Sequence, residues 1–228
     1  MQAELIDGIV LLEWNMFQSV NEGNGARASC QDDEATFRAM RRAQFLSWSE
    51  PCADSYFKDL TFAASEDRNL IAEKYIHMMK TTSPSQYEKL LAAIKPPGAE
   101  ICELAARICA ELVAQTAALR KKYPYVAGAG RPLYSEEDFS GVVSVQTYQY
   151  GELLTYSAQT LRRLEAHIAA LKSEGQSLAE EILRRTAEYY GYTSLEQAEN
   201  AQRKHIESQP IIFSAGCDCD SCGGACNA

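Results

Sequence analysis

The chain has 228 residues, 46% of them hydrophobic, which is enough for one full-sized domain or two small ones. Its seven prolines and thirteen glycines are too few for a disordered or fibrous chain. With 31 acidic and 22 basic residues the net charge is −9, which argues against nucleic acid or an anionic membrane as the main partner. The longest aliphatic run, residues 9–12, cannot span a membrane, and the N-terminus lacks the basic start of a signal peptide. We therefore expect a cytoplasmic protein.

Apolar residues with helical spacing predict an all-α protein of about nine helices. Caps and breakers mark the ends of several of them, for example a capping box at Ser83 and another at Ser177. In chain order the helices are expected at about residues 3–20, 33–48, 49–64, 68–81, 83–96, 99–123, from 144 onward, 177–191 and from 194. Residues 124–143 lack this periodicity, and a loop of that length in a compact domain is usually functional or disordered.

The chain contains a weak internal repeat. A shift of 108 residues places residues 37–75 over 145–183 without a gap, with six identities where two or three are expected by chance. Under this shift Gln44 falls on Glu152 and Trp48 falls on Tyr156. The match suggests, without deciding it, that one helical domain (residues 1–206) consists of two pseudo-symmetric halves, residues 1–95 and 99–206, with a pocket between them. Residues 207–228 form a separate Cys-rich tail.

Several helices carry polar side chains on otherwise apolar faces. Helix residues three, four and seven apart share a face, and by this spacing the following side chains point inward: Glu13, Arg41, Gln44, Lys74, Glu152 and Tyr156. Burying a charge is costly unless the charge is paired. These residues either form internal ion pairs that hold the helices in register or line a shared polar cavity. Four charges on different helices favour the cavity.

A glycine-containing segment, residues 23–33, precedes the second predicted helix. Arg27 offers a planar donor group for a carboxylate or phosphate, and the free N–H groups of the helix start favour anions. Cys30 next to this start could be a nucleophile. Asp32 and Asp33 are either part of the same site or simple helix caps.

Four short motifs resemble a known family. They are Arg-Ala-Ser-Cys-Gln-Asp-Asp at residues 27–33, Asn-Leu-x-x-Glu-Lys-Tyr at 69–75, Gly-Arg-Pro at 130–132 and Gly-Glu-Leu at 151–153. Over residues 3–200 the chain resembles the bacterial family called domain of unknown function 4125. The resemblance implies no established activity. The residues that it marks overlap with the inward polar set: Glu13, Arg27, Cys30, Asp32, Glu73, Lys74, Arg131 and Glu152.

Four cysteines crowd the end of the chain as Cys-x-Cys-x2-Cys-x3-Cys: Cys217, Cys219, Cys222 and Cys226. Four thiolates suit Zn²⁺ or an iron–sulfur cluster, and the neighbouring glycines allow tight turns. The alternative is a redox-sensitive terminus whose thiols pair when they are oxidised. The resemblance does not extend to this tail.

The favoured hypothesis is an enzyme-like helical pocket that binds a small anionic molecule, with the reaction unknown. Its candidate catalytic residues are Glu13, Cys30, Glu73, Lys74 and Glu152. Its candidate substrate-binding residues are Arg27, Asp32, Arg41, Gln44, Tyr75, Arg131 and Tyr156. One alternative is a non-catalytic protein that handles a soft metal or senses redox state through the tail. The other is a helical adaptor in which the buried charges are structural and a protein partner binds the surface.

Overall fold

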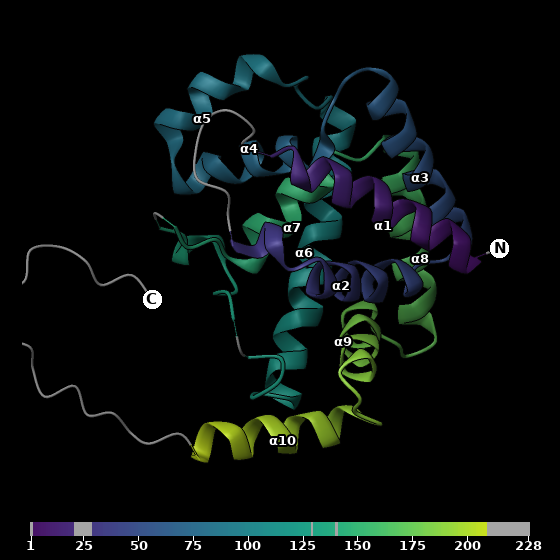
Figure 1. Cartoon of the computed structure of the whole chain (residues 1–228), viewed down its shortest axis with the longest axis vertical. Helices are drawn as coiled ribbons and strands as arrows, with labels where there is room; N and C mark the ends of the chain where they lie inside the picture. Colours follow the sequence, from purple (N-terminus) through teal and green to yellow (C-terminus); the bar gives the residue numbers. More distant parts are fainter. Residues whose placement is uncertain (1, 21–28, 129, 140, 209–228) are drawn as a thin grey trace, which may run out of the picture.

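The computed structural model describes residues 2–20, 29–128, 130–139 and 141–208. These residues form ten α-helices and, apart from one isolated bridge between Phe139 and Val142, no β-structure (Figure 1). The predicted all-α fold is therefore confirmed. The helices in chain order are α1 Gln2–Gln18, α2 Glu34–Leu46, α3 Glu50–Ser65, α4 Leu70–Thr82, α5 Pro84–Leu90, α6 Ala99–Lys122, α7 Val145–Leu153, α8 Ala158–Ser173, α9 Leu178–Tyr189 and α10 Leu195–Ser208.

The tenth helix arises from a break that helical spacing alone does not reveal. The segment from residue 144 onward was expected to continue as one helix, but it divides into α7 and α8. Ser157 begins α8 because its hydroxyl accepts a hydrogen bond from the Thr160 N–H at 3.2 Å. Just before this cap, the Tyr156 hydroxyl donates to the Glu152 carboxylate at 2.6 Å. The break thus turns a tyrosine toward the interior of the protein.

The packing of α1–α4 is repeated by α6–α9 (Figure 1). Helix α1 packs against α2, α3 and α4, and α6 packs in the same way against α7, α8 and α9. Between the halves, α3 packs against its counterpart α8, and α2 contacts α9 just as α7 contacts α4. Exchanging the two sets of helices leaves this list of contacts unchanged, which is the pattern of a pseudo-twofold axis.

Backbone details follow the same shift of 108 residues. Adding 108 to the bounds of α3 gives 158–173, the bounds of α8, and the first residues of α4 and α9 also coincide. The turn after each helix contains a residue of positive φ: Asp67 at 54° and Gly175 at 73°. In both turns the next N–H bonds back to the helix, from Arg68 to the Ala63 carbonyl at 2.9 Å and from Gln176 to that of Leu171 at 2.8 Å. These correspondences support the duplication that the sequence suggests.

The main hydrophobic core joins both halves, with buried residues from α1, α3, α4, α6, α8 and α9. A smaller core holds α10 against α6 and α9, and its buried members are Leu119, Tyr123, Ala187, Leu195 and Ala198. Among the described residues, no helix is both long and apolar enough to cross a bilayer.

Candidate functional site

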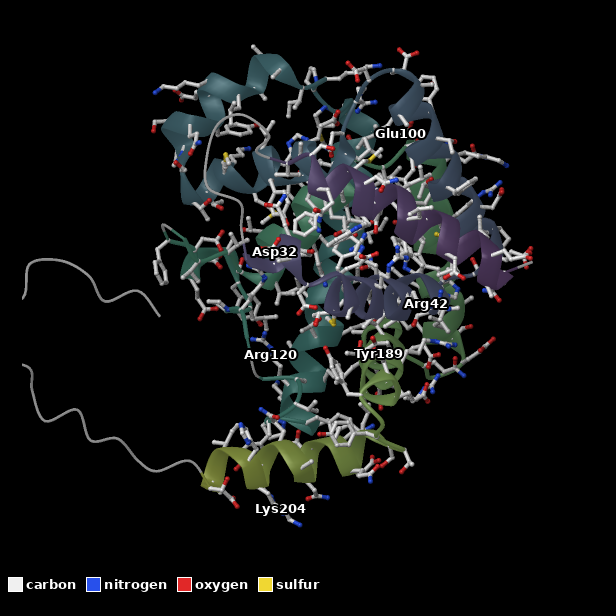
Figure 2. The ribbon with its side chains drawn as sticks, viewed as in Figure 1. Asp32, Arg42, Glu100, Arg120, Tyr189 and Lys204 are labelled. Carbon is white, nitrogen blue, oxygen red and sulfur yellow. The ribbon has the colours of Figure 1, made fainter. Side chains whose placement is uncertain are left out.

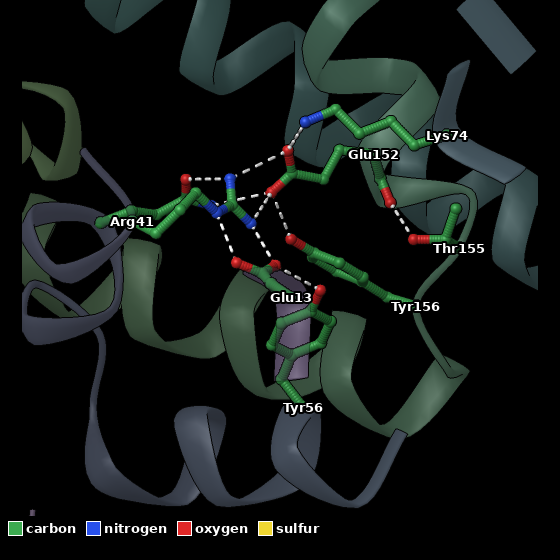
Figure 3. Close-up of polar contacts among 8 residues, drawn as sticks. Glu13, Arg41, Tyr56, Lys74, Glu152, Thr155 and Tyr156 are labelled. Carbon is green, nitrogen blue, oxygen red and sulfur yellow. Dashed lines mark hydrogen bonds and ion pairs between the residues drawn. The ribbon is translucent and has the colours of Figure 1, made fainter. Parts of the chain in front are cut away.

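A buried ionic network lies where the two halves meet (Figure 3). Arg41 of α2 is its centre. Its guanidinium donates to the Glu13 carboxylate of α1 with Nε–Oε2 at 2.6 Å and Nη2–Oε1 at 2.5 Å. On its other side it donates to the Glu152 carboxylate of α7, with Nη2–Oε1 at 3.0 Å and Nη1–Oε2 at 3.3 Å. Arg41 therefore bridges two carboxylates from different halves, using the fork geometry that suits a planar guanidinium.

Lys74 and Gln44 complete the polar shell around Glu152. The Lys74 ammonium of α4 contacts Glu152 Oε2 at 2.5 Å. The Gln44 amide donates to Glu152 Oε1 at 3.0 Å and accepts from Arg41 Nη1 at 2.9 Å. All four charged side chains are at most 8% exposed. Two carboxylates and two cations are present, so the formal charges of the network cancel.

Two buried tyrosines close the network from below (Figure 3). The Tyr56 hydroxyl donates to Glu13 Oε1 at 2.7 Å, and the Tyr156 hydroxyl donates to Glu152 Oε1 at 2.6 Å. Burial first, and the adjacent carboxylate next, hold the pKa of each phenol well above its usual value. Both hydroxyls therefore remain protonated donors at neutral pH.

Glu152 and Lys74 keep their charges at neutral pH. Burial alone would raise the pKa of Glu152, but Arg41 and Lys74 outweigh this effect and hold that pKa well below its usual value. Burial alone would likewise lower the pKa of Lys74, but Glu152 reverses the direction and raises it. Glu152 is thus a carboxylate and Lys74 an ammonium, so at neutral pH the first holds no proton to donate and the second cannot accept one.

A pocket of about 570 Å³ opens above this network, between α1, α2, α4, α7 and α9. Arg41, Gln44, Lys74, Glu152 and Tyr156 form its polar side. Its remaining walls are largely aromatic and aliphatic, including Phe17, Phe37, Trp48, Ile71, Tyr75, Leu112, Val145, Tyr148, Leu153, Leu164, Leu178 and Ile182. A concave, mostly apolar space with a few convergent polar groups is the usual form of a small-molecule site.

Fourteen of the 24 lining residues form seven pairs that are separated by the 108-residue shift. These pairs are Phe37 and Val145, Met40 and Tyr148, Arg41 and Gln149, Gln44 and Glu152, Trp48 and Tyr156, Ile71 and Ala179, and Lys74 and Ile182. Each half therefore supplies equivalent positions to the pocket. The pocket lies on the pseudo-twofold axis, so it exists only when both halves are packed together.

Two residues at the edge of the pocket are open to solvent. Arg131 lies in the segment between α6 and α7, where its guanidinium carbon sits 5.0 Å from the ring centre of Tyr148 and its Nη1 donates to the Val143 carbonyl at 3.2 Å. Within the described residues Arg131 makes no ion pair. Cys30 lies in the 3₁₀ turn Ser29–Asp32 and is exposed at the pocket.

The predicted site residues are only partly brought together. Cys30, Arg41, Gln44, Lys74, Tyr75, Arg131, Glu152 and Tyr156 line the pocket, and Glu13 lies directly behind Arg41. Glu73 faces elsewhere, because its carboxylate is held by Arg68 at 2.7 and 2.8 Å. Asp32 is exposed and is not a lining residue, whereas its neighbour Asp33 lines the pocket and also caps α2 by accepting from the Thr36 N–H at 3.0 Å. Arg27 lies outside the described residues.

A family model described as protein of unknown function (DUF4125) matches residues 3–200. The chain belongs to this family. The match covers the ionic network, the pocket and the first part of α10, and it ends before the cysteine tail. No curated protein and no solved structure matches the chain.

Several aromatic residues of the pocket and the network are not among the predicted site residues. The sequence does indicate Tyr148, since it lies four residues before Glu152 on the same helix face. In the structure its ring centre is 3.6 Å from Lys74 Nζ. The sequence gives no indication of a role for Tyr56, because it lies on a face of α3 whose other buried members are ordinary core residues. Phe17 and Phe37, which stack at 5.2 Å, are likewise indistinguishable from core aromatics in the sequence.

The described residues contain no cluster of three or more His, Cys, Asp or Glu side chains that could hold a metal ion. The predicted ligands Cys217, Cys219, Cys222 and Cys226 lie outside the described residues. Cys52 and Cys109 are buried thiols, and burial raises their pKa to about 12 and about 11. They are therefore poor metal ligands and poor nucleophiles.

Proposed function

We propose that this protein binds a small organic anion in the central pocket. The proposal rests on the combination of the apolar walls of the pocket with an arginine at its edge. Aromatic and aliphatic side chains from both halves surround a space of about 570 Å³, and Arg131 stands at its edge without an acidic partner in the described structure. A planar or apolar body fits such walls, and a guanidinium is a suitable partner for a carboxylate or phosphate.

The ionic network is the rigid floor of this site in our proposal. Arg41 and Lys74 already have carboxylate partners, so neither has a free positive charge to give to a ligand. A network whose members are all hydrogen-bonded fixes the helices and orients the tyrosines. This supports ligand binding more directly than acid–base catalysis by Glu13, Lys74 or Glu152. It also favours a binding pocket over a helical adaptor, which would need no such space.

The first experiment asks whether a molecule is already bound. Protein purified without denaturation is analysed by native mass spectrometry, and released compounds are identified by liquid chromatography and mass spectrometry. We expect an organic anion of a few hundred daltons at about one equivalent, as a pocket of several hundred Å³ implies. The bound compound is then titrated back onto protein from which it has been removed by partial unfolding and refolding.

Matched variants of Tyr75 locate the bound molecule. Tyr75 lines the pocket, is half-buried and stacks 6.4 Å from Phe17. Tyr75→Ala should lose most of the bound compound, whereas Tyr75→Phe, which keeps the ring, should retain it. Tyr189→Ala is the control, because Tyr189 is 55% exposed and lines neither cavity. Equal ligand content in Tyr75→Ala and Tyr189→Ala would contradict the proposal.

A further inference from the structure

A second cavity adjoins the central pocket. This cavity, of about 700 Å³, lies between α6, α9, α10 and the segment that follows α6. The two spaces share the side chains of Met40, Arg131, Val145, Gln149, Ala179 and Ile182. Because Arg131 and Gln149 line both cavities, a ligand in the central pocket lies next to the second cavity at these two residues.

Two arginines meet at this junction without a carboxylate. Arg120, near the end of α6, donates from Nη2 to the Arg131 backbone carbonyl at 2.8 Å, and Figure 2 labels it beside the lower part of α6. Its Nε is buried and has no hydrogen-bond partner. Neither arginine forms an ion pair with any described residue. By contrast, Lys122 on the same helix is paired with Glu180, and Arg107 is paired with Glu165.

A buried donor without a partner is unfavourable, so such a group in a cavity indicates a missing acceptor. Gln149 lies between the two cavities with its Oε1 buried and unpaired, but this atom is an acceptor, so it requires a donor group and not the anion. The surroundings are apolar: Val126, Leu183, Ala187 and the rings of Tyr190 and Tyr192 line the second cavity. Arg120 Nε is buried there without an acceptor, whereas Arg131 is open to solvent and has no carboxylate partner among the described residues. An anion between them would gain charge-assisted hydrogen bonds.

We infer that the ligand is an amphiphilic organic anion whose charged group, a carboxylate, sulfonate or phosphate, binds between Arg120 and Arg131. Its aromatic or aliphatic body lies in the central pocket. This inference rests on the proposed function, and it adds the position of the charge. It moves the anion away from Arg41 and Lys74, whose charges are already neutralised, to a pair of arginines from α6 and the following segment.

Two fluorescent probes of the same skeleton test this assignment. 8-Anilinonaphthalene-1-sulfonate carries a sulfonate, and N-phenyl-1-naphthylamine lacks it. Both are titrated into the full-length protein with fluorescence and calorimetry. We expect both probes to bind at about one equivalent, the sulfonate more tightly, and only the sulfonate to weaken as the salt concentration is raised.

Variants test the contribution of each arginine to binding separately from that of the pocket walls. Arg120→Gln and Arg131→Gln should each weaken the sulfonate about tenfold, the usual value of one charge-assisted hydrogen bond, and leave the neutral probe unchanged. Arg120→Lys should keep part of the affinity because it retains the charge. Arg107→Gln is the control on the same helix and should bind both probes as the wild type does. Circular dichroism confirms that each variant is folded, and any unfolded variant is replaced by its lysine counterpart.

The outcomes distinguish the two proposals. If both probes bind and Tyr75→Ala weakens both, but Arg120→Gln and Arg131→Gln bind the sulfonate as tightly as the wild type, the arginine assignment is wrong and the central pocket stands. Equal weakening of both probes by Arg120→Gln would also overturn the assignment, because it would show a general loss of packing. If neither probe binds, or if Tyr75→Ala changes neither affinity, the proposed function itself is contradicted.

Discussion

Gln44 and Glu152 are separated by 108 residues in the sequence, and their side chains hydrogen-bond to each other with Nε2–Oε1 at 3.0 Å. The same shift relates Trp48 to Tyr156, whose ring centres lie 5.9 Å apart. Equivalent positions of a repeated unit touch each other only close to the axis that relates them. The ionic network and the pocket above it are therefore built on the pseudo-twofold axis.

The two halves are equivalent in backbone but not in charge. The counterpart of Arg41 is Gln149, and the counterpart of Lys74 is Ile182. Both cations of the network thus come from the first half, while Glu152 comes from the second. Their ion pairs at 3.0 and 2.5 Å cross the boundary and tie the halves together. The second half places a polar but uncharged residue, Gln149, at the pocket. On this side of the pocket a ligand can therefore supply the charge.

Removal of Arg41 should strongly destabilise the fold. Arg41→Met leaves Glu152 paired with Lys74 but leaves the buried Glu13 without a cation among the described residues, and breaking a buried ion pair costs about 3–5 kcal/mol. Arg38→Met is the control, because Arg38 lies on the same helix but forms only an exposed pair with Glu34, worth less than about 1 kcal/mol. Urea unfolding followed by circular dichroism measures both values. Similar losses for the two variants would show that the network contributes no more than a surface pair.

Stability should fall on the acid side because of Glu152. Its folded pKa lies well below the ordinary value of 4.5, so the unfolded chain binds a proton before the folded chain does. The stabilisation is complete above that ordinary value and is lost as the pH falls from about 4.5 toward the lower folded pKa. Glu152→Gln should have a shallower decline in the free energy of unfolding over this range, measured by urea unfolding at a series of pH values. Glu165→Gln, at an exposed pair, is the control, and an equal decline in wild type and Glu152→Gln would contradict the assignment.

Helical spacing was sufficient to predict which polar side chains point inward. Glu13, Arg41, Lys74 and Glu152 were each placed on an apolar face, and in the structure they meet. The spacing could not tell which carboxylate would pair with which cation. Glu73 precedes Lys74 directly, but successive helix residues point about 100° apart, and Arg68 at the preceding turn binds Glu73 instead.

Other features of the site and the fold cannot be predicted from a single sequence. Arg120 stands in the basic last turn of α6 beside Lys121 and Lys122, a position where cations usually complement the helix dipole at the surface. Its position at the second cavity depends on how α9 and α10 pack against α6, and this tertiary packing cannot be predicted from the local sequence. The break between α7 and α8 was also hidden, since this segment contains no proline, whereas Pro51 marks the equivalent break between α2 and α3.

The repeated turn gives a test of backbone strain. Gly175 has φ of 73°, and a Cβ built there meets no atom within 4 Å, so Gly175→Ala changes only the conformational preference. We expect a loss of about 1 kcal/mol in the free energy of unfolding. The reciprocal change, Asp67→Gly, relieves the same left-handed conformation at φ 54° and should not destabilise the protein. A loss in Asp67→Gly as large as that in Gly175→Ala would show that the two turns are not equivalent.

Thiol labelling should favour Cys30 over the buried cysteines Cys52 and Cys109. Cys30 is exposed, whereas burial raises the pKa of Cys52 to about 12 and of Cys109 to about 11. Brief treatment with iodoacetamide at pH 8, followed by peptide mapping, should modify Cys30 far faster than Cys52 or Cys109. Because Cys30 lines the pocket, a bound organic anion should slow its modification. Unchanged labelling in the presence of saturating ligand would place the ligand elsewhere.

The Cys-rich tail should bind a soft metal independently of the helical domain. We propose that Cys217, Cys219, Cys222 and Cys226 form a single four-thiolate site, because four thiolates within ten residues match the ligand set of structural zinc. The reduced full-length protein should then bind about one equivalent of Zn²⁺ or Cd²⁺ and release protons as it does so. A chain ending at residue 208 should lose this metal and keep its helical circular dichroism, because the ten helices end there.

The metal content of the full-length chain and of the chain ending at residue 208 is measured in parallel by mass spectrometry. Cys30→Ser in the full-length chain is the matched control, since it removes an exposed thiol from the helical domain and leaves the tail intact. It should bind metal as the wild type does. Iron and acid-labile sulfide in the protein as purified would instead identify an iron–sulfur cluster on the same four cysteines. Equal metal in the full-length and shortened chains would place the ligands within the helical domain, and a parallel loss in Cys30→Ser would make Cys30 one of them.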